Sequence, residues 1–151
     1  MSESLEKIIK EKISADHLLY VSMKYTKTCD VIINLLQRWK IMMDYAFDAL
    51  LEKAKKKKMI KKIPSAPKLK TDLVGEVFAD EPAVIDALKE HQMFKLIKIL
   101  KNTKEGEFRK GVCLRVTYRG EEVAINLDKL KEYTETLERF INYTKLFLTS
   151  K

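Results

Sequence analysis

A run of lysines is the feature of this sequence whose residue type and spacing most directly suggest chemistry. Seven lysines and no acidic residue fall within ten positions: Lys53, Lys55, Lys56, Lys57, Lys58, Lys61 and Lys62. Lysines this dense attract polyanions, because each one that meets a phosphate releases a condensed counterion. They also complement the partial negative charge at the C-terminus of a helix. The run therefore predicts a surface for RNA or another polyanion, with a solvated helix end as the simpler alternative.

A second set of basic residues follows later in the chain. It consists of Lys95, Lys98, Lys101, Lys104, Arg109, Lys110, Arg115 and Arg119. Contacts from such side chains to phosphates provide affinity but carry no sequence information. If this set shares one face with the lysine run, the two form a surface that can follow a phosphate backbone. The nucleic-acid-binding candidates are therefore the seven lysines of the run together with Lys98, Lys101, Arg109, Lys110 and Arg115.

Side chains that could carry catalysis or bind a metal are few and scattered. His17 and His91 belong to no Glu-x-x-His or His-x3-His pattern, so each is expected to be a surface or interface residue. Asp44, Asp48 and Glu52 form a carboxylate stripe at i, i+4 and i+8. The favoured interpretation is a solvated helix face on which Lys40 and Lys56 offer i, i+4 partners. We expect no catalytic residue, no metal and no cofactor, which favours a protein without enzyme activity.

Length and composition bound the class of protein. The 151 residues predict a single domain over residues 1–151, and the net charge of +8 favours polyanionic partners. The apolar runs are too short to span a membrane, and the first 15 residues lack the apolar core of a signal peptide. Cys29 falls in an apolar seam and Cys113 in an expected strand, so both should be buried and reduced. A cytoplasmic location is expected.

One long amphipathic stretch must position the lysine run. Residues 16–62 contain no Gly or Pro and carry a heptad seam, which predicts one helix of about 40 residues. The seam consists of Leu18, Tyr25, Ile32, Trp39 and Ala46, interleaved with Cys29, Leu36, Met43 and Leu50. From residue 31 to 51 the apolar face widens, so it must be covered on most sides. A bundle core and a homodimer seam both satisfy this. We expect a homodimer, with Ile32, Leu36, Trp39 and Met43 as interface candidates.

Shorter helices are predicted on either side of this stretch. Residues 2–13 are amphipathic, and a break near Ser14 or continuation into the long helix are both open. A short helix is expected over about 69–78, followed by one from Pro82 to about Lys101. The last helix should run over 128–149, capped by Asn126 or Asp128.

The period changes from helical to alternating between about 112 and 127. Apolar residues then occupy every second position on both sides of Arg119-Gly120, which predicts a β-hairpin turning there. The expected fold class is mainly α: an elongated helical bundle around one long N-terminal helix, with a small C-terminal β-hairpin before the last helix.

Two resemblances add to this description. The segments ADHLLYVSMKYT at 15–26 and EFRKGV at 107–112, with the hairpin and the closing helix over 133–143, are similar to a family of small, uncharacterised archaeal helical proteins. Long paired helices that end in a basic connection also resemble HEPN domains, helical bundles often found as ribonucleases or antitoxin-linked toxins. Active HEPN members use an Arg-x4–6-His motif, and neither Arg38 nor Arg109 is followed by a histidine at that spacing.

Three function hypotheses follow. The leading one is a non-enzymatic, cytosolic binding or scaffold module that associates with RNA or another polyanion through its lysine-rich surface. The alternatives are a HEPN-like ribonuclease or toxin-related protein, which the second resemblance implies, and a protein–protein adaptor.

Overall fold

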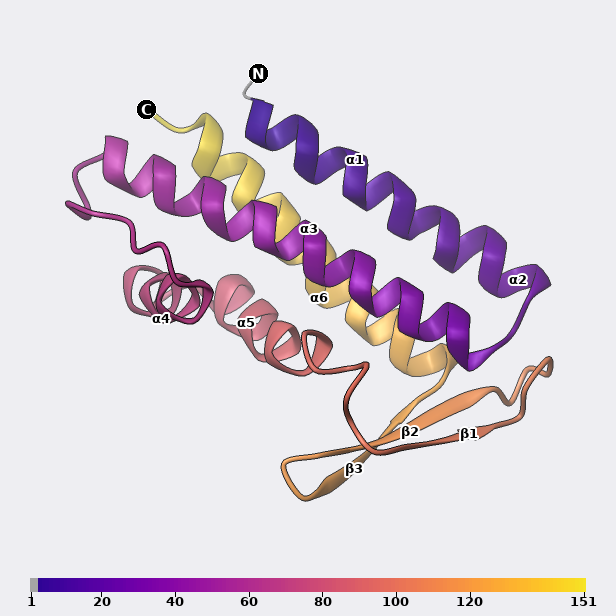
Figure 1. The fold of residues 1–151 in the computed structure, drawn as a ribbon. Helices are drawn as coiled ribbons and strands as arrows, with labels where there is room; N and C mark the ends of the chain where they lie inside the picture. The colour runs from indigo at the N-terminus through magenta and orange to yellow at the C-terminus, as the bar shows by residue number, and fades with distance from the viewer. Residues whose placement is uncertain (1–2) are drawn as a thin grey trace.

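Three long helices lie side by side in the computed structural model, which describes residues 3–151. They are α1 (Glu3–His17), α3 (Cys29–Lys56) and α6 (Leu127–Thr149). Helix α1 runs antiparallel to α3, whereas α6 runs in the same direction as α3 (Figure 1). A Lys12–Glu138 ion pair of 3.0 Å ties α1 to α6 directly. The chain is mainly helical, as the sequence predicts, with one small antiparallel sheet before the last helix.

The expected continuous helix over 16–62 is instead two antiparallel segments. Helix α1 continues unbroken past Ser14, a π-helical turn η1 (Leu18–Ser22) and the short α2 (Met23–Tyr25) follow, and the chain then reverses. The helical backbone ends at Tyr25, and Thr28 marks the start of the next helix. The Thr28 backbone is extended, and its hydroxyl oxygen accepts a hydrogen bond from the Val31 N–H at 3.3 Å, which caps α3. The residues of the heptad seam are therefore divided between two antiparallel segments instead of lying along one helix.

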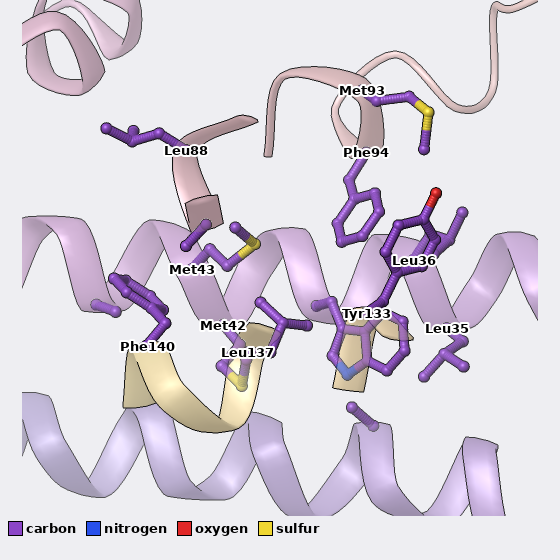
Figure 2. Close-up of a cluster of buried hydrophobic side chains, with 14 of the residues drawn as sticks. Leu35, Leu36, Met42, Met43, Leu88, Met93, Phe94, Tyr133, Leu137 and Phe140 are labelled. Atoms are coloured by element: carbon purple, nitrogen blue, oxygen red, sulfur yellow. The ribbon is translucent and has the colours of Figure 1, made fainter. Parts of the chain in front are cut away.

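The four predicted dimer-interface residues lie in the core of one chain. Ile32, Leu36 and Met43 are 0% exposed and Trp39 is 4% exposed. Helices α1, α5 and α6 cover α3, and Leu36 and Met43 lie in the buried cluster with Phe94 (Figure 2). The Trp39 ring packs with its centroid 6.0 Å from that of the Phe94 ring. Because the chain itself covers the broad apolar face of α3, these residues have no surface to offer a second copy, and the expected homodimer seam is not supported.

A hydrogen-bonded motif ends α3 inside the lysine run. The Met59 N–H donates to the Ala54 carbonyl at 2.9 Å, and the Lys58 N–H donates to the Lys55 carbonyl at 3.0 Å. Lys58 itself has a φ of 62°, in the left-handed region. These two bonds and this φ define a Schellman motif with Lys58 at the C′ position.

Two shorter helices follow the lysine run and cover the same side of α3. Helix α4 (Pro67–Val77) matches the predicted short helix, and α5 (Pro82–Phe94) begins at proline as expected. Helix α5 ends seven residues before Lys101, however. Successive i to i−3 hydrogen bonds, including Ile97 N–H to the Phe94 carbonyl, tighten the chain there and lead it into the sheet.

The predicted hairpin is present and has a third strand. Strand β2 (Cys113–Tyr118) pairs with β3 (Glu121–Ile125), so that Tyr118 faces Glu121 across the Arg119-Gly120 turn. Both turn residues have positive φ, 52° and 79°, as a type I′ turn requires. The strand absent from the prediction is β1 (Asn102–Glu105), which pairs with the other edge of β2. Helix α6 then begins where the Asn126 side chain accepts from the Lys129 N–H at 2.8 Å.

Candidate functional site

The lysine run lies at the C-terminal end of α3 and in the turn that follows it. Lys53 and Lys57 are partly buried, and the other five lysines are exposed. Lys57 lies over the Phe147 ring, 5.0 Å from its centroid, which ties the run to the end of α6. We call these seven residues, Lys53, Lys55, Lys56, Lys57, Lys58, Lys61 and Lys62, the lysine end.

No lysine of the lysine end forms an ion pair with a carboxylate within residues 3–151. Other basic residues do: Lys40 pairs with Asp44 at 2.7 Å, and Lys70 pairs with Asp48 at 3.1 Å. The C-terminal dipole of α3 stabilises nearby cations by only about 0.3–1 kcal/mol each. Seven like charges in ten residues also repel one another. A polyanion would relieve this repulsion.

The second basic set lies elsewhere. Arg109 and Lys110 are exposed in the loop between β1 and β2, at the end of the molecule where α3 begins (Figure 1). Lys98 and Lys101 are exposed between α5 and β1. Helix α3 has 28 residues and is therefore about 40 Å long, so its two ends are well separated. The lysine end and the Arg109–Lys110 loop do not share one face.

Arg115 is engaged within the sheet. Its Nε donates to both Glu105 carboxylate oxygens at 2.7 and 2.9 Å, and its Nη1 donates to Glu122 at 2.9 Å. These acceptors on β1 and β3 hold the guanidinium and neutralise it. Arg115, although predicted to bind nucleic acid, therefore has a structural role in the sheet, and its guanidinium is not free to contact a phosphate.

A cleft of about 350 Å³ opens between α3, α4 and α5. Its polar lining includes four lysines, two aspartates and a histidine: Lys40, Lys68, Lys70, Lys95, Asp44, Asp48 and His91. Residues four apart share one face of a helix, so Asp44 and Asp48 are followed on α3 by Glu52 and then by Lys56. The cleft and the lysine end are thus joined along one face of α3.

His91 holds Asp44 at the edge of this cleft. Its Nε2 lies 2.7 Å from Asp44 Oδ1, and Lys40 Nζ lies 2.7 Å from the other carboxylate oxygen. Burial alone would raise the pKa of Asp44. The hydrogen bonds from His91 and Lys40 lower it by more than burial raises it, so the pKa lies below its ordinary value. An ionised Asp44 can only accept, so Nε2 is the donor.

The second ring nitrogen of His91 does not reach the cleft. His91 is 4% exposed, its Nδ1 is enclosed without a hydrogen-bond partner, and its ring packs edge-on against Phe47 at 5.1 Å. With one nitrogen bonded to Asp44 and the other enclosed, the imidazole presents no free nitrogen to a substrate. It positions the carboxylate. The other histidine, His17, is exposed at the end of α1.

The burial of His91 differs from the surface position that the sequence favours. A signal was present: Ala87, Leu88 and Phe94 lie three or four residues from His91, so it falls on the apolar face of its helix. Its partner Asp44 is 47 residues away, and no local pattern indicates that contact. The predicted Lys40 partner of Asp44 is confirmed.

The two cysteines are free and buried, as predicted. Cys29 Sγ lies 3.4 Å from the Cys113 carbonyl oxygen, which it meets as a weak donor. Burial, followed by a side-chain hydrogen bond with Glu107, raises the pKa of Cys29 to about 12. The thiol therefore stays protonated and is a poor nucleophile. Within residues 3–151, no group of three or more His, Cys, Asp or Glu side chains gathers as a metal site would need.

Comparison with protein-family models, curated proteins and solved structures found no match to this chain. In the part of the chain that the structure describes, no helix combines the length and apolar character needed to cross a membrane.

Proposed function

We propose that this protein is a non-enzymatic, cytosolic binding module that associates with RNA or another polyanion through the lysine end. The observation that supports it most strongly is that seven lysines occupy ten residues without one carboxylate partner among the described residues. A folded chain that gained nothing from this charge would be more stable with acids interspersed, as they are around Lys40 and Lys70.

The neighbouring cleft supports the same proposal. Lys68 and Lys70 enter it from α4, directly after the loop that carries Lys61 and Lys62, and Lys95 enters from α5. Three of its four lysines pair with carboxylates, Lys40 with Asp44, Lys68 with Asp72 and Lys70 with Asp48. Lys95 has no such partner among the described residues, so the cleft adds a modest positive charge beside the lysine end.

The proposal is tested by removing charge from the lysine end without disturbing its packing. Lys55, Lys56, Lys58 and Lys61 are exposed, whereas Lys57 packs on Phe147 and is left in place. The variant K55Q/K56Q/K58Q/K61Q should bind a short mixed-sequence RNA about tenfold or more weakly than the unmodified protein, by fluorescence anisotropy.

A matched control removes the same charge elsewhere. Lys7, Lys10, Lys89 and Arg139 are exposed on α1, α5 and α6, outside the candidate residues. The variant K7Q/K10Q/K89Q/R139Q should retain most of the RNA affinity. Equal losses in the two variants would mean that net charge alone attracts RNA and that the lysine end is no site.

A further inference from the structure

A groove at the opposite end of the molecule from the lysine end has a different character. A hollow of about 480 Å³ lies between η1–α2 and the start of α6, with Leu19, Met23 and Leu127 among its apolar lining. An adjoining hollow of about 350 Å³ shares Leu127 and Lys131 with it and continues toward Lys110. The two hollows therefore lie next to each other, between the end of the helical hairpin and the sheet, and we refer to them together as the groove.

Large aromatic side chains are exposed around this groove. Tyr20 is 62% exposed and lines it, Tyr25 is 78% exposed at the end of α2, and Phe108 is 75% exposed in the β1–β2 loop. Elsewhere the aromatic rings of this chain mostly pack against one another, as Trp39, Phe94 and Tyr133 do. Exposed aromatic rings that gather at one end of a molecule mark an interaction surface.

The Phe108 loop is held in place. The Phe108 N–H donates to the Lys27 carbonyl at 2.6 Å, and Glu107 accepts from the Cys29 N–H at 3.3 Å, so the loop is docked on the α2–α3 connection. Figure 1 shows this loop beside α2. Phe108 also has a φ of 67°, a conformation that costs a non-glycine residue about 1 kcal/mol or more. The fold thus displays this ring on a fixed, strained backbone.

Cations surround the same rings. Lys24, Lys27 and Lys131 line the first hollow, and Arg109 and Lys110 follow Phe108 directly. None of these five forms an ion pair within residues 3–151, and the carboxylates that line the groove are Asp128 and Glu135. Lys24 Nζ lies 5.8 Å from the Tyr25 ring centroid. The groove therefore has one exposed ring in its lining, Tyr20, and the adjoining segments carry the exposed rings of Tyr25 and Phe108 together with cations that have no carboxylate partner.

We infer that this groove binds single-stranded nucleic acid by stacking unpaired bases on Tyr20, Tyr25 and Phe108, while its lysines and arginine contact the phosphates. An exposed ring can stack on any base face, which is how sequence-tolerant single-strand sites work. A duplex keeps its base faces stacked on one another and cannot use the rings. The inference rests on the proposed function and narrows its ligand class to single strands. It places base contacts at the end of the molecule opposite the lysine end.

The test distinguishes protein contacts to bases from protein contacts to phosphates. Three probes of equal length and equal label are used: oligouridine, an abasic phosphodiester chain, and an RNA duplex. The variant Y25A/F108A should lose about tenfold or more in affinity for oligouridine. Its affinity for the abasic chain and for the duplex should stay within about twofold of the unmodified protein, because the cations are intact. The control Y25F/F108Y keeps both rings and should bind oligouridine normally.

Other outcomes overturn the inference. Unchanged oligouridine binding by Y25A/F108A, with an intact thermal unfolding transition, would show that the rings do not stack on bases. An equal loss for all three probes would show a purely electrostatic role. A third outcome is that the unmodified protein binds a polyglutamate peptide more tightly than oligouridine and that Y25A/F108A no longer binds this peptide. The groove would then be a site for acidic peptides. The lysine-end variant weakens all three nucleic-acid probes, so failure of the proposed function is seen separately.

Discussion

Lys58 occupies a position at the end of α3 where glycine is the usual residue. Its φ of 62° is strained for a side chain with a Cβ, yet its N–H completes the Schellman motif. Replacing it with glycine should relieve this strain and raise the free energy of unfolding by about 0.5–1 kcal/mol. A higher midpoint in urea denaturation would show this. The control Lys61→Gly lies outside the motif and should not stabilise the protein; a destabilised Lys58→Gly would refute the assignment of the motif.

Asp44 links the cleft to stability through its lowered pKa. The folded protein keeps this carboxylate ionised to lower pH than the unfolded chain does. Its contribution is therefore complete above the unfolded pKa of about 3.9 and is lost as the pH falls through the lower, folded value. Because its side chain is 39% exposed, Asp44→Asn should cost only about 1 kcal/mol at pH 7, and less at pH 3.

Urea denaturation at pH 7, 5 and 3 measures this dependence. Asp72→Asn serves as the control, because the Asp72 side chain is 53% exposed and its lysine partner lies 3.4 Å away at the surface. A deficit in Asp44→Asn that is as large at pH 3 as at pH 7 would mean that the ionised carboxylate is not what His91 and Lys40 stabilise.

At the scale of the elements, local patterns account for what the sequence predicted correctly. The hairpin was recognisable because apolar residues alternate and Arg119-Gly120 suits a two-residue turn. Strand β1 was not, because Asn102 to Glu105 are polar and their place in the sheet comes from pairing with β2. The end of α5 was missed for a related reason: apolar residues continue after Phe94, but the chain must turn to reach β1.

The break before α3 was the main feature of the fold that the heptad pattern did not predict. Periodicity alone does not distinguish one long helix from two antiparallel helices with the same seam. The distinguishing signal was local: Thr28 can cap a helix, and Asp30 falls in the first turn behind it.

Removal of this cap tests the interpretation. Thr28→Ala should lower the free energy of unfolding by about 1 kcal/mol, because the Val31 N–H loses its side-chain acceptor. The comparison is Thr26→Ala, an exposed threonine two residues earlier, which should change stability by no more than a few tenths of a kcal/mol. Chemical denaturation of both variants decides the point; equal effects would mean that the cap does not define the start of α3.

For the whole molecule, the sequence could identify basic residues but could not place them. The lysine end was visible as a run because its members are adjacent in the chain. Whether Arg109 and Lys110 join it depended on which end of α3 carries the sheet, and that is set by long-range packing. The same packing covers Ile32, Leu36 and Met43 within one chain, where the heptad pattern suggested a second copy.

The groove near the sheet could not be predicted from the sequence either. Phe108 is far from Tyr20 and Tyr25 in sequence, and the two tyrosines belong to a stretch that was expected to be helical. Their exposure follows from the π-helical turn, the short α2 and the docked β1–β2 loop, none of which leaves a periodic signal.

The most direct test of the central claim, that the lysine end contacts phosphates, is the salt dependence of RNA binding. For single strands, the slope of log affinity against log salt is about −0.7 per neutralised phosphate. The variant K55Q/K56Q/K58Q/K61Q should therefore have a slope shallower by about 3 than the unmodified protein, and K7Q/K10Q/K89Q/R139Q should match the unmodified protein. A slope near zero for the unmodified protein, or one that the lysine-end variant leaves unchanged, would contradict the proposed function.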